Sequence, residues 1–112
     1  MAWQAKHKYA RISSRKARLI VEMIRGLDVQ DAMNILEFMP HRAAGMVSKT
    51  LASAIANANE AEADVDRLVV NEARVDEGPT IKRGRLKDRG RFHPIMKRTS
   101  HIVVAVEEEP ER

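Results

Sequence analysis

Two short stretches rich in β-branched residues most constrain the fold, because each is long enough for one strand only. They are RLVVNEARV at residues 67–75 and HIVVAV at 101–106. The stretch between them, at about 80–101, holds eight Lys and Arg residues against one acid, Asp88. Asp88 and Gly90 at its centre have the chemistry of a tight turn. We therefore predict two antiparallel strands joined by a long basic β-hairpin.

Three apolar patterns with helical spacing precede these strands. The first begins at Ser13 or Ser14, either of which can cap a helix, and ends at Gly26. The second begins at Asp28 and ends at Pro40, and the third spans about 42–60. The predicted inner faces of the three helices are, in order, Ala17, Ile20, Val21 and Ile24; Ala32, Ile35, Leu36 and Met39; and Ala44, Val47, Leu51, Ile55 and Ala58.

Four further features complete the predicted architecture. Phe38 is expected in the core, and Gly45 is expected to let a neighbouring backbone approach the third helix closely. Residues 4–12 alternate loosely and predict a basic strand, whereas the acidic tail at 107–112 is expected to be frayed. The fold class is α+β: three helices packed on a small antiparallel three-stranded sheet, with a protruding hairpin. The length of 112 residues suits a single domain at 1–112.

Charge is segregated along the chain, although its net value is only +4. Residues 4–18 hold six Lys and Arg residues and no acid, and the hairpin stretch has eight Lys and Arg residues and only one acid. The rest of the chain therefore carries a net negative charge. Ordinary surfaces mix the two signs, whereas a nucleic acid presents a dense line of negative charge. Arg15, Lys16 and Arg18 on the first helix continue the N-terminal basic stretch, which favours phosphate contact over ordinary solvated surface.

The predicted hairpin has too little apolar surface to be stable alone. Arms of about ten residues would reach roughly 30 Å beyond the sheet. A lone two-stranded ribbon is marginal in water, and its eight cations repel each other. We expect RNA phosphates to order it; the alternative is a solvated basic loop.

Several function classes lack support in the sequence. The absence of Cys excludes disulfides and thiolate metal sites, and the four His residues have no metal-ligand spacing, so we expect neither a metal nor a cofactor. No apolar run is long enough to span a membrane or to serve as a secretory signal, which predicts a soluble cytoplasmic protein. Ser13-Ser14-Arg15-Lys16 matches the S-x-x-K pattern of serine acyl-enzymes, but a helix cap explains it better.

Among the aromatic residues, Trp3, Tyr9 and Phe92 adjoin cations and suit either base stacking or hydrophobic anchoring. His7 and His101 lie within basic stretches and suit polar contacts to RNA. The sequence does not decide between base stacking and hydrophobic anchoring for these aromatic residues.

Five ordered motifs carry a family resemblance: AKHKYARISSRKAR at 5–18, IRG at 24–26, SAIANA at 53–58, VDEGP at 75–79 and IMKRTSHI at 95–102. Together they resemble bacterial large-ribosomal-subunit protein 22 over nearly the whole chain. The resemblance implies a structural protein that binds large-subunit ribosomal RNA, assists its assembly and lines the nascent-peptide exit tunnel. It also implies neighbouring ribosomal proteins and the nascent polypeptide as partners, and no enzymatic activity.

The resemblance also implies roles for individual residues. The ingoing arm contacts RNA through Lys82, Arg83 and Arg85, and the tunnel-facing tip comprises Lys87, Asp88, Arg89, Gly90 and Arg91. The return arm contacts RNA through Lys97, Arg98, Thr99, Ser100 and His101. The N-terminal RNA-contacting segment comprises Lys6, Lys8, Arg11, Ser13, Lys16 and Arg18.

The tip departs from the family pattern, which commonly reads P-R-A-x-G-R-A. Here Leu86 replaces the proline, and Asp88 and Phe92 replace alanines, while Gly90 and Arg91 are kept. An RNA-binding regulator or chaperone that works off the ribosome and a small hydrolase using Ser13 and Lys16 remain the competing hypotheses.

Overall fold

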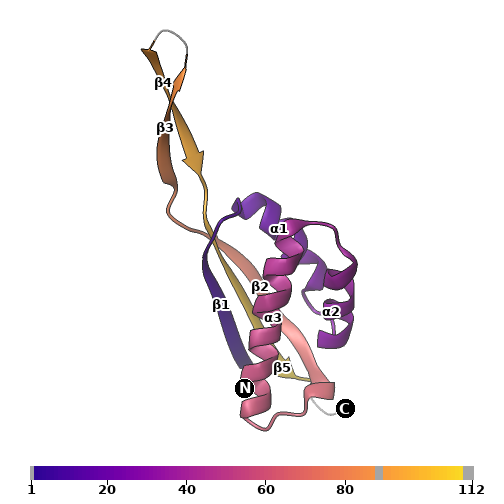
Figure 1. Ribbon diagram of the computed structural model, residues 1–112. Coiled ribbons are helices and arrows are strands. Elements are labelled where there is room, and N and C mark those ends of the chain that lie inside the picture. The colour runs from indigo at the N-terminus through magenta and orange to yellow at the C-terminus, as the bar shows by residue number, and fades with distance from the viewer. Residues whose placement is uncertain (1, 88–89, 110–112) are drawn as a thin grey trace.

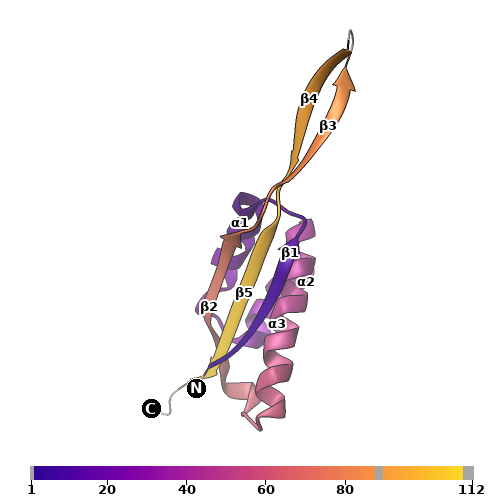
Figure 2. The ribbon, with the colours of Figure 1, turned by 90° about the vertical axis from the view of Figure 1, so that its left-hand side faces the viewer.

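The computed structural model describes residues 2–87 and 90–109, with side chains described for all of these except 85–87 and 91–93. Its elements are β1 (Ala2–Ala10), α1 (Ser14–Ile24), α2 (Val29–Phe38), α3 (Arg42–Glu60), η1 (Val65–Arg67), β2 (Leu68–Glu77), β3 (Ile81–Lys87), β4 (Arg91–Lys97) and β5 (Ser100–Glu108). The helices cover one face of a sheet, and a hairpin extends from its end (Figures 1 and 2). The α+β prediction is confirmed.

The sheet is antiparallel in the order β1-β5-β2. The central strand β5 is buried from Ile102 to Val106, and its alternate residues Ile102, Val104 and Val106 join the core beneath the helices. On the other face, Val103 lies between Lys6 of β1 and Arg74 of β2. At this position the face therefore carries a cation on each edge strand and an apolar side chain on the central strand.

The strands β2 and β5 are longer than predicted, because their pairing continues to both ends. Leu68 pairs with Glu108, and Glu77 pairs with Ser100. The prediction of a frayed tail from residue 107 is therefore wrong for its first part: residues 107 and 108 belong to β5, and the Glu109 amide donates to the Arg67 carbonyl at 2.8 Å. Residues 110–112 lie outside the described residues.

The helices begin and end where the sequence predicts. Ser13 is the N-cap of α1, and its Oγ accepts from the Lys16 amide at 3.4 Å. After α1 the chain turns at Gly26, whose φ of +83° suits a residue without a side chain. Asp28 occupies the N-cap position of α2, although its side chain makes no capping hydrogen bond.

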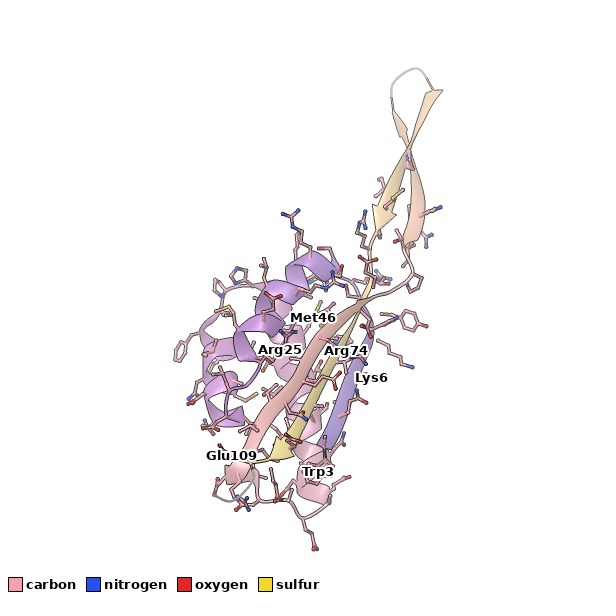
Figure 3. All side chains as sticks on the ribbon, turned by 180° about the vertical axis from the view of Figure 1, so that it is seen from behind. Trp3, Lys6, Arg25, Met46, Arg74 and Glu109 are labelled. Atoms are coloured by element: carbon pink, nitrogen blue, oxygen red, sulfur yellow. The ribbon has the colours of Figure 1, made fainter. Side chains whose placement is uncertain are left out.

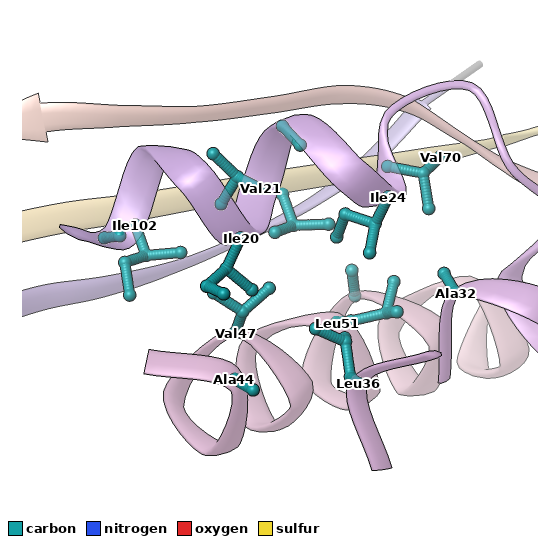
Figure 4. Packing of buried hydrophobic residues seen from close by; sticks show 14 of the residues in the cluster. Ile20, Val21, Ile24, Ala32, Leu36, Ala44, Val47, Leu51, Val70 and Ile102 are labelled. Carbon is teal, nitrogen blue, oxygen red and sulfur yellow. The ribbon is translucent and has the colours of Figure 1, made fainter. Parts of the chain in front are cut away.

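The core forms where the three helices meet the sheet (Figure 4). Ile20, Val21 and Ile24 of α1 are buried, as predicted, against Val47 and Leu51 of α3. Burying a side chain of this kind stabilises the fold by roughly 1.5–3 kcal/mol. The relative placement of helices and sheet is therefore set by these side chains.

Two core predictions are wrong. Phe38 is 85% exposed, because it follows Leu36 by two residues and so lies on the opposite side of α2 from that buried side chain. Gly45 is exposed, and a Cβ added there would meet nothing within 4 Å, so no backbone approaches α3 at this point.

The hairpin is a separate two-stranded sheet made by β3 and β4, paired from Ile81↔Lys97 to Lys87↔Arg91. Gly90 has a φ of +69°. The molecule measures 68 Å along its longest axis and 25 and 19 Å across it, and the hairpin lies along the long axis (Figure 2). Seven residues at about 3.3 Å each make an arm of about 23 Å, shorter than the ten-residue arms predicted.

Candidate nucleic-acid interface

The hairpin is joined to the body by buried hydroxyl groups. The Thr99 Oγ1 donates to the Pro79 carbonyl at 2.5 Å, and the Gly78 amide donates to the Thr99 carbonyl at 3.0 Å. The Ser100 Oγ donates to the Ile12 carbonyl at 2.7 Å. Thr99 and Ser100 are 5% and 0% exposed, and their hydroxyl groups satisfy backbone carbonyls; their assignment as RNA contacts stays a prediction.

His101 also lies at the junction between the hairpin and the body. Its Nδ1 accepts from the Tyr9 amide at 3.1 Å, and the two rings meet edge to face with centroids 4.9 Å apart. Tyr9 has a φ of +58° at an irregularity in the pairing of β1 with β5, and its side chain is 61% exposed. The ring of Tyr9 is thus held in place and still accessible, which keeps base stacking open. Trp3 packs partly buried against the core, which favours anchoring there.

Several arginine side chains already form hydrogen bonds or ion pairs within the globular body. The Arg18 Nη2 donates to the Val75 carbonyl at 3.1 Å, and Arg25 donates twice to the Ala73 carbonyl, at 3.2 and 2.6 Å. Arg74 forms ion pairs with Glu72 at 2.8 Å and Asp76 at 2.9 Å. Arg25 and Arg74 are labelled in Figure 3. These side chains hold helix α1 or strand β2 in place, and Nη2 of Arg18 already has a backbone partner.

A groove of about 840 Å³ lies at the base of the hairpin, and we call it the hairpin-base groove. Three segments line it: the start of α1 with the loop before it, the start of α3, and the return arm of the hairpin. The lining residues are Arg11, Ile12, Ser13, Lys16, Leu19, His41, Arg42, Ala43, Met96, Lys97 and Arg98. The structure thus brings together Arg11 and Lys16 with Lys97 and Arg98, which the sequence placed in two separate basic stretches.

The groove is cationic, and no acidic side chain among its described lining residues neutralises its positive charge. Five of its lining residues are Lys or Arg and none is acidic. Within residues 2–87 and 90–109, no carboxylate forms a salt bridge with Arg11, Lys16, Arg42, Lys97 or Arg98. His41 and Arg42 were not predicted as site residues, because they lie outside both basic stretches and only the packing of α3 brings them to the groove.

The other predicted RNA-binding residues lie away from the groove. Lys6 and Lys8 are exposed on β1, and Arg15 is exposed on α1. Lys82 and Arg83 are exposed on the ingoing arm. The side chains of Arg85, Lys87, Arg91 and Phe92, and residues 88 and 89 altogether, lie outside what the structure describes, so of the predicted tip only Gly90 is fully placed.

Helical membrane spans and clusters of metal ligands are both absent from residues 2–87 and 90–109. No helix in that part of the chain is both long enough and apolar enough to cross a bilayer. No group of three or more His, Asp or Glu side chains there gathers as metal ligands do.

Residues 5–107 match the protein family described as Ribosomal protein L22p/L17e. A relative from Magnetococcus marinus, "Large ribosomal subunit protein uL22", is 53% identical over 104 residues, which cover 92% of each chain. The chain belongs to the L22p/L17e family of ribosomal proteins. As a member of this family it is a structural, non-enzymatic constituent of the large ribosomal subunit. The hydrolase hypothesis is therefore wrong, and Ser13 acts instead as the cap of α1.

Proposed function

We propose that this chain binds large-subunit ribosomal RNA through its hairpin and the hairpin-base groove, assists folding of that RNA during assembly, and lines the nascent-peptide exit tunnel with the hairpin tip. One observation carries the proposal: within residues 2–87 and 90–109, the cations that line the base of the hairpin form no salt bridge with a carboxylate, whereas Arg74 on the body is paired with Glu72 and Asp76. A protruding ribbon of this kind gains its stability from phosphates on several sides.

The proposal extends to individual residues and partners. Lys6, Lys8, Arg11, Arg15 and Lys16 contact phosphates from the body; Lys82, Arg83, Arg85, Lys97 and Arg98 do so from the hairpin. Neighbouring ribosomal proteins and the nascent polypeptide are further partners, and the protein works in the cytoplasm within the large subunit. Phosphate contacts set the position, and RNA shape supplies the selectivity.

The RNA-binding step is tested by replacing Lys97 and Arg98 together with Ala. Both side chains are exposed and carry no described ion pair, so the helices should stay folded while affinity for transcribed large-subunit RNA falls. The slope of log affinity against log salt should also fall by about one unit per lost contact. The control is Lys49→Ala with Arg74→Ala, which removes the same charge from the body. Normal RNA binding by the Lys97/Arg98 variant contradicts the assignment.

The tunnel assignment needs a separate test. A photoreactive amino acid at Gly90 should crosslink to a nascent chain stalled in the tunnel, because Gly90 belongs to the far end of the protruding hairpin (Figure 1). The same amino acid at Lys49 of α3 should not. Crosslinks to ribosomal RNA alone from position 90 would refute the tunnel assignment and leave RNA binding standing.

A further inference from the structure

The hairpin-base groove differs from the rest of the basic surface in being concave and built from three distant segments. Lys16 and Leu19 belong to α1, Arg42 to α3, and Met96 and Lys97 to the return arm. Its volume of about 840 Å³ lies within the range of roughly 300–1,000 Å³ typical of ligand-binding clefts. A flat contact to the outside of an RNA helix would need no such hollow.

The charge of the groove is complementary to an anionic occupant. Five Lys and Arg residues line the groove, and none of its lining residues is acidic. Like charges brought together in this way oppose folding, and internal ion pairs such as Arg74 with Glu72 show that the chain supplies carboxylates elsewhere. An occupant that carries several negative charges removes this cost.

The groove also offers apolar contacts that phosphates alone would leave in water. Leu19 is 64% exposed and Met96 is 55% exposed, and both belong to the lining. Such side chains suit a flat apolar face lying between charged groups. A nucleobase taken out of its helical stack presents such a face, and its own backbone supplies the phosphates.

We propose that the hairpin-base groove holds a single-stranded segment of ribosomal RNA, with its phosphates against the groove cations, Arg42 included, and an unstacked base against Leu19 and Met96. This inference rests on the proposed RNA-binding function and adds α3 to the contact surface. The RNA strand ties the return arm to the body, since Lys97 and Arg98 of the return arm line the same groove as residues of α1 and α3.

The charged contact is tested with Arg42→Ala and its matched control Lys49→Ala. Both residues are exposed on α3, and each change removes one positive charge, but Lys49 does not line the groove. Arg42→Ala should weaken binding of the full-length protein to transcribed large-subunit RNA roughly tenfold, since hydrogen bonds to charged groups are among the stronger ones. It should also lower the salt slope by about one unit, whereas Lys49→Ala should change neither.

The apolar contact is tested with Leu19→Ser and its matched control Met23→Ser. Both residues are exposed on α1, and Met23, one turn further on, does not line the groove. The probes are a short mixed-sequence RNA single strand and a blunt duplex of equal length. Leu19→Ser should weaken binding to the single strand several-fold without changing the salt slope, and should leave duplex binding unchanged. Met23→Ser should leave both unchanged.

The outcomes separate the two proposals. Equal effects of Arg42→Ala and Lys49→Ala would mean that only net charge matters, which overturns the groove assignment and leaves RNA binding intact. Equal losses on duplex and single strand for Leu19→Ser would overturn the unstacked base. Failure of the unaltered protein to bind large-subunit RNA would overturn the proposed function and this inference with it. Thermal unfolding of each variant confirms that it is folded.

Discussion

Gly78 lies at the junction between body and hairpin, and among the glycines whose surroundings are described it alone has close neighbours, which makes Gly78→Ala an informative change. A Cβ at this position would lie 2.6 Å from the Thr99 Oγ1 and 3.3 Å from the His101 ring. The hydroxyl must therefore move, which gives up its hydrogen bond to the Pro79 carbonyl. That bond contributes about 0.5–1.5 kcal/mol, and forcing a side chain away from its rotamer costs about 0.5–1.5 kcal/mol.

The two costs of Gly78→Ala total about 1–3 kcal/mol. Replacing glycine also makes the unfolded chain less flexible, which offsets about 0.4–1 kcal/mol. We therefore expect a net loss of up to about 2.6 kcal/mol in the free energy of unfolding, measured by urea denaturation. In a chain near this size, each kcal/mol lowers the Tm by about 4–8 °C.

The double variant tests whether Thr99 is the cause. In a Thr99→Ala background the clashing hydroxyl is absent, so adding Gly78→Ala should cost little or slightly stabilise the protein. The double-mutant cycle should therefore show a coupling energy of at least about 1 kcal/mol. If Gly78→Ala costs the same in both backgrounds, the hydroxyl is not what constrains the glycine, and the reasoning is refuted.

Three further changes probe the body, each followed by urea denaturation. Gly45→Ala should stabilise the protein by about 0.5–1 kcal/mol, because the position is an exposed helix interior with open space around it; a loss of stability would mean an unseen contact. Ser100→Ala should cost about 1–3 kcal/mol by leaving the Ile12 carbonyl buried without its donor, so an unchanged midpoint would count against that bond. Ile20→Asp should unfold the domain at room temperature, because a charge would enter the core; a cooperative transition near that of the unaltered protein would contradict the packing.

The helices were predictable because their signals are local. The apolar spacing of Ala17, Ile20, Val21 and Ile24 and the cap at Ser13 depend only on neighbours a few residues away. Phe38 shows the limit of this reasoning. Its hydrophobicity suggested the core, but its angular position on α2 relative to Leu36 determines that it faces solvent.

The candidate site was predictable only in part, because its residues meet through tertiary packing. The two basic stretches were evident, yet nothing in them indicates that Arg11 and Lys97 line one groove. Arg42 carries no local signal, since a single cation at a helix start is common. The family resemblance implied that Thr99 and Ser100 contact RNA, but no local signal shows that Ser100 is buried, because its burial depends on the pairing of β5 with both of its neighbours.

Arginine illustrates why charge counts alone do not define a binding surface. Arg25 and Arg74 have the same formal charge as Arg42 and Arg98, but Arg25 is bound to the Ala73 carbonyl and Arg74 to neighbouring carboxylates. A guanidinium already paired in this way must give up its partner before it can bind a phosphate, whereas one facing water gives up only solvent. Affinity for RNA should therefore depend on the unpaired subset that gathers at the hairpin base, and removing a paired arginine should chiefly affect stability.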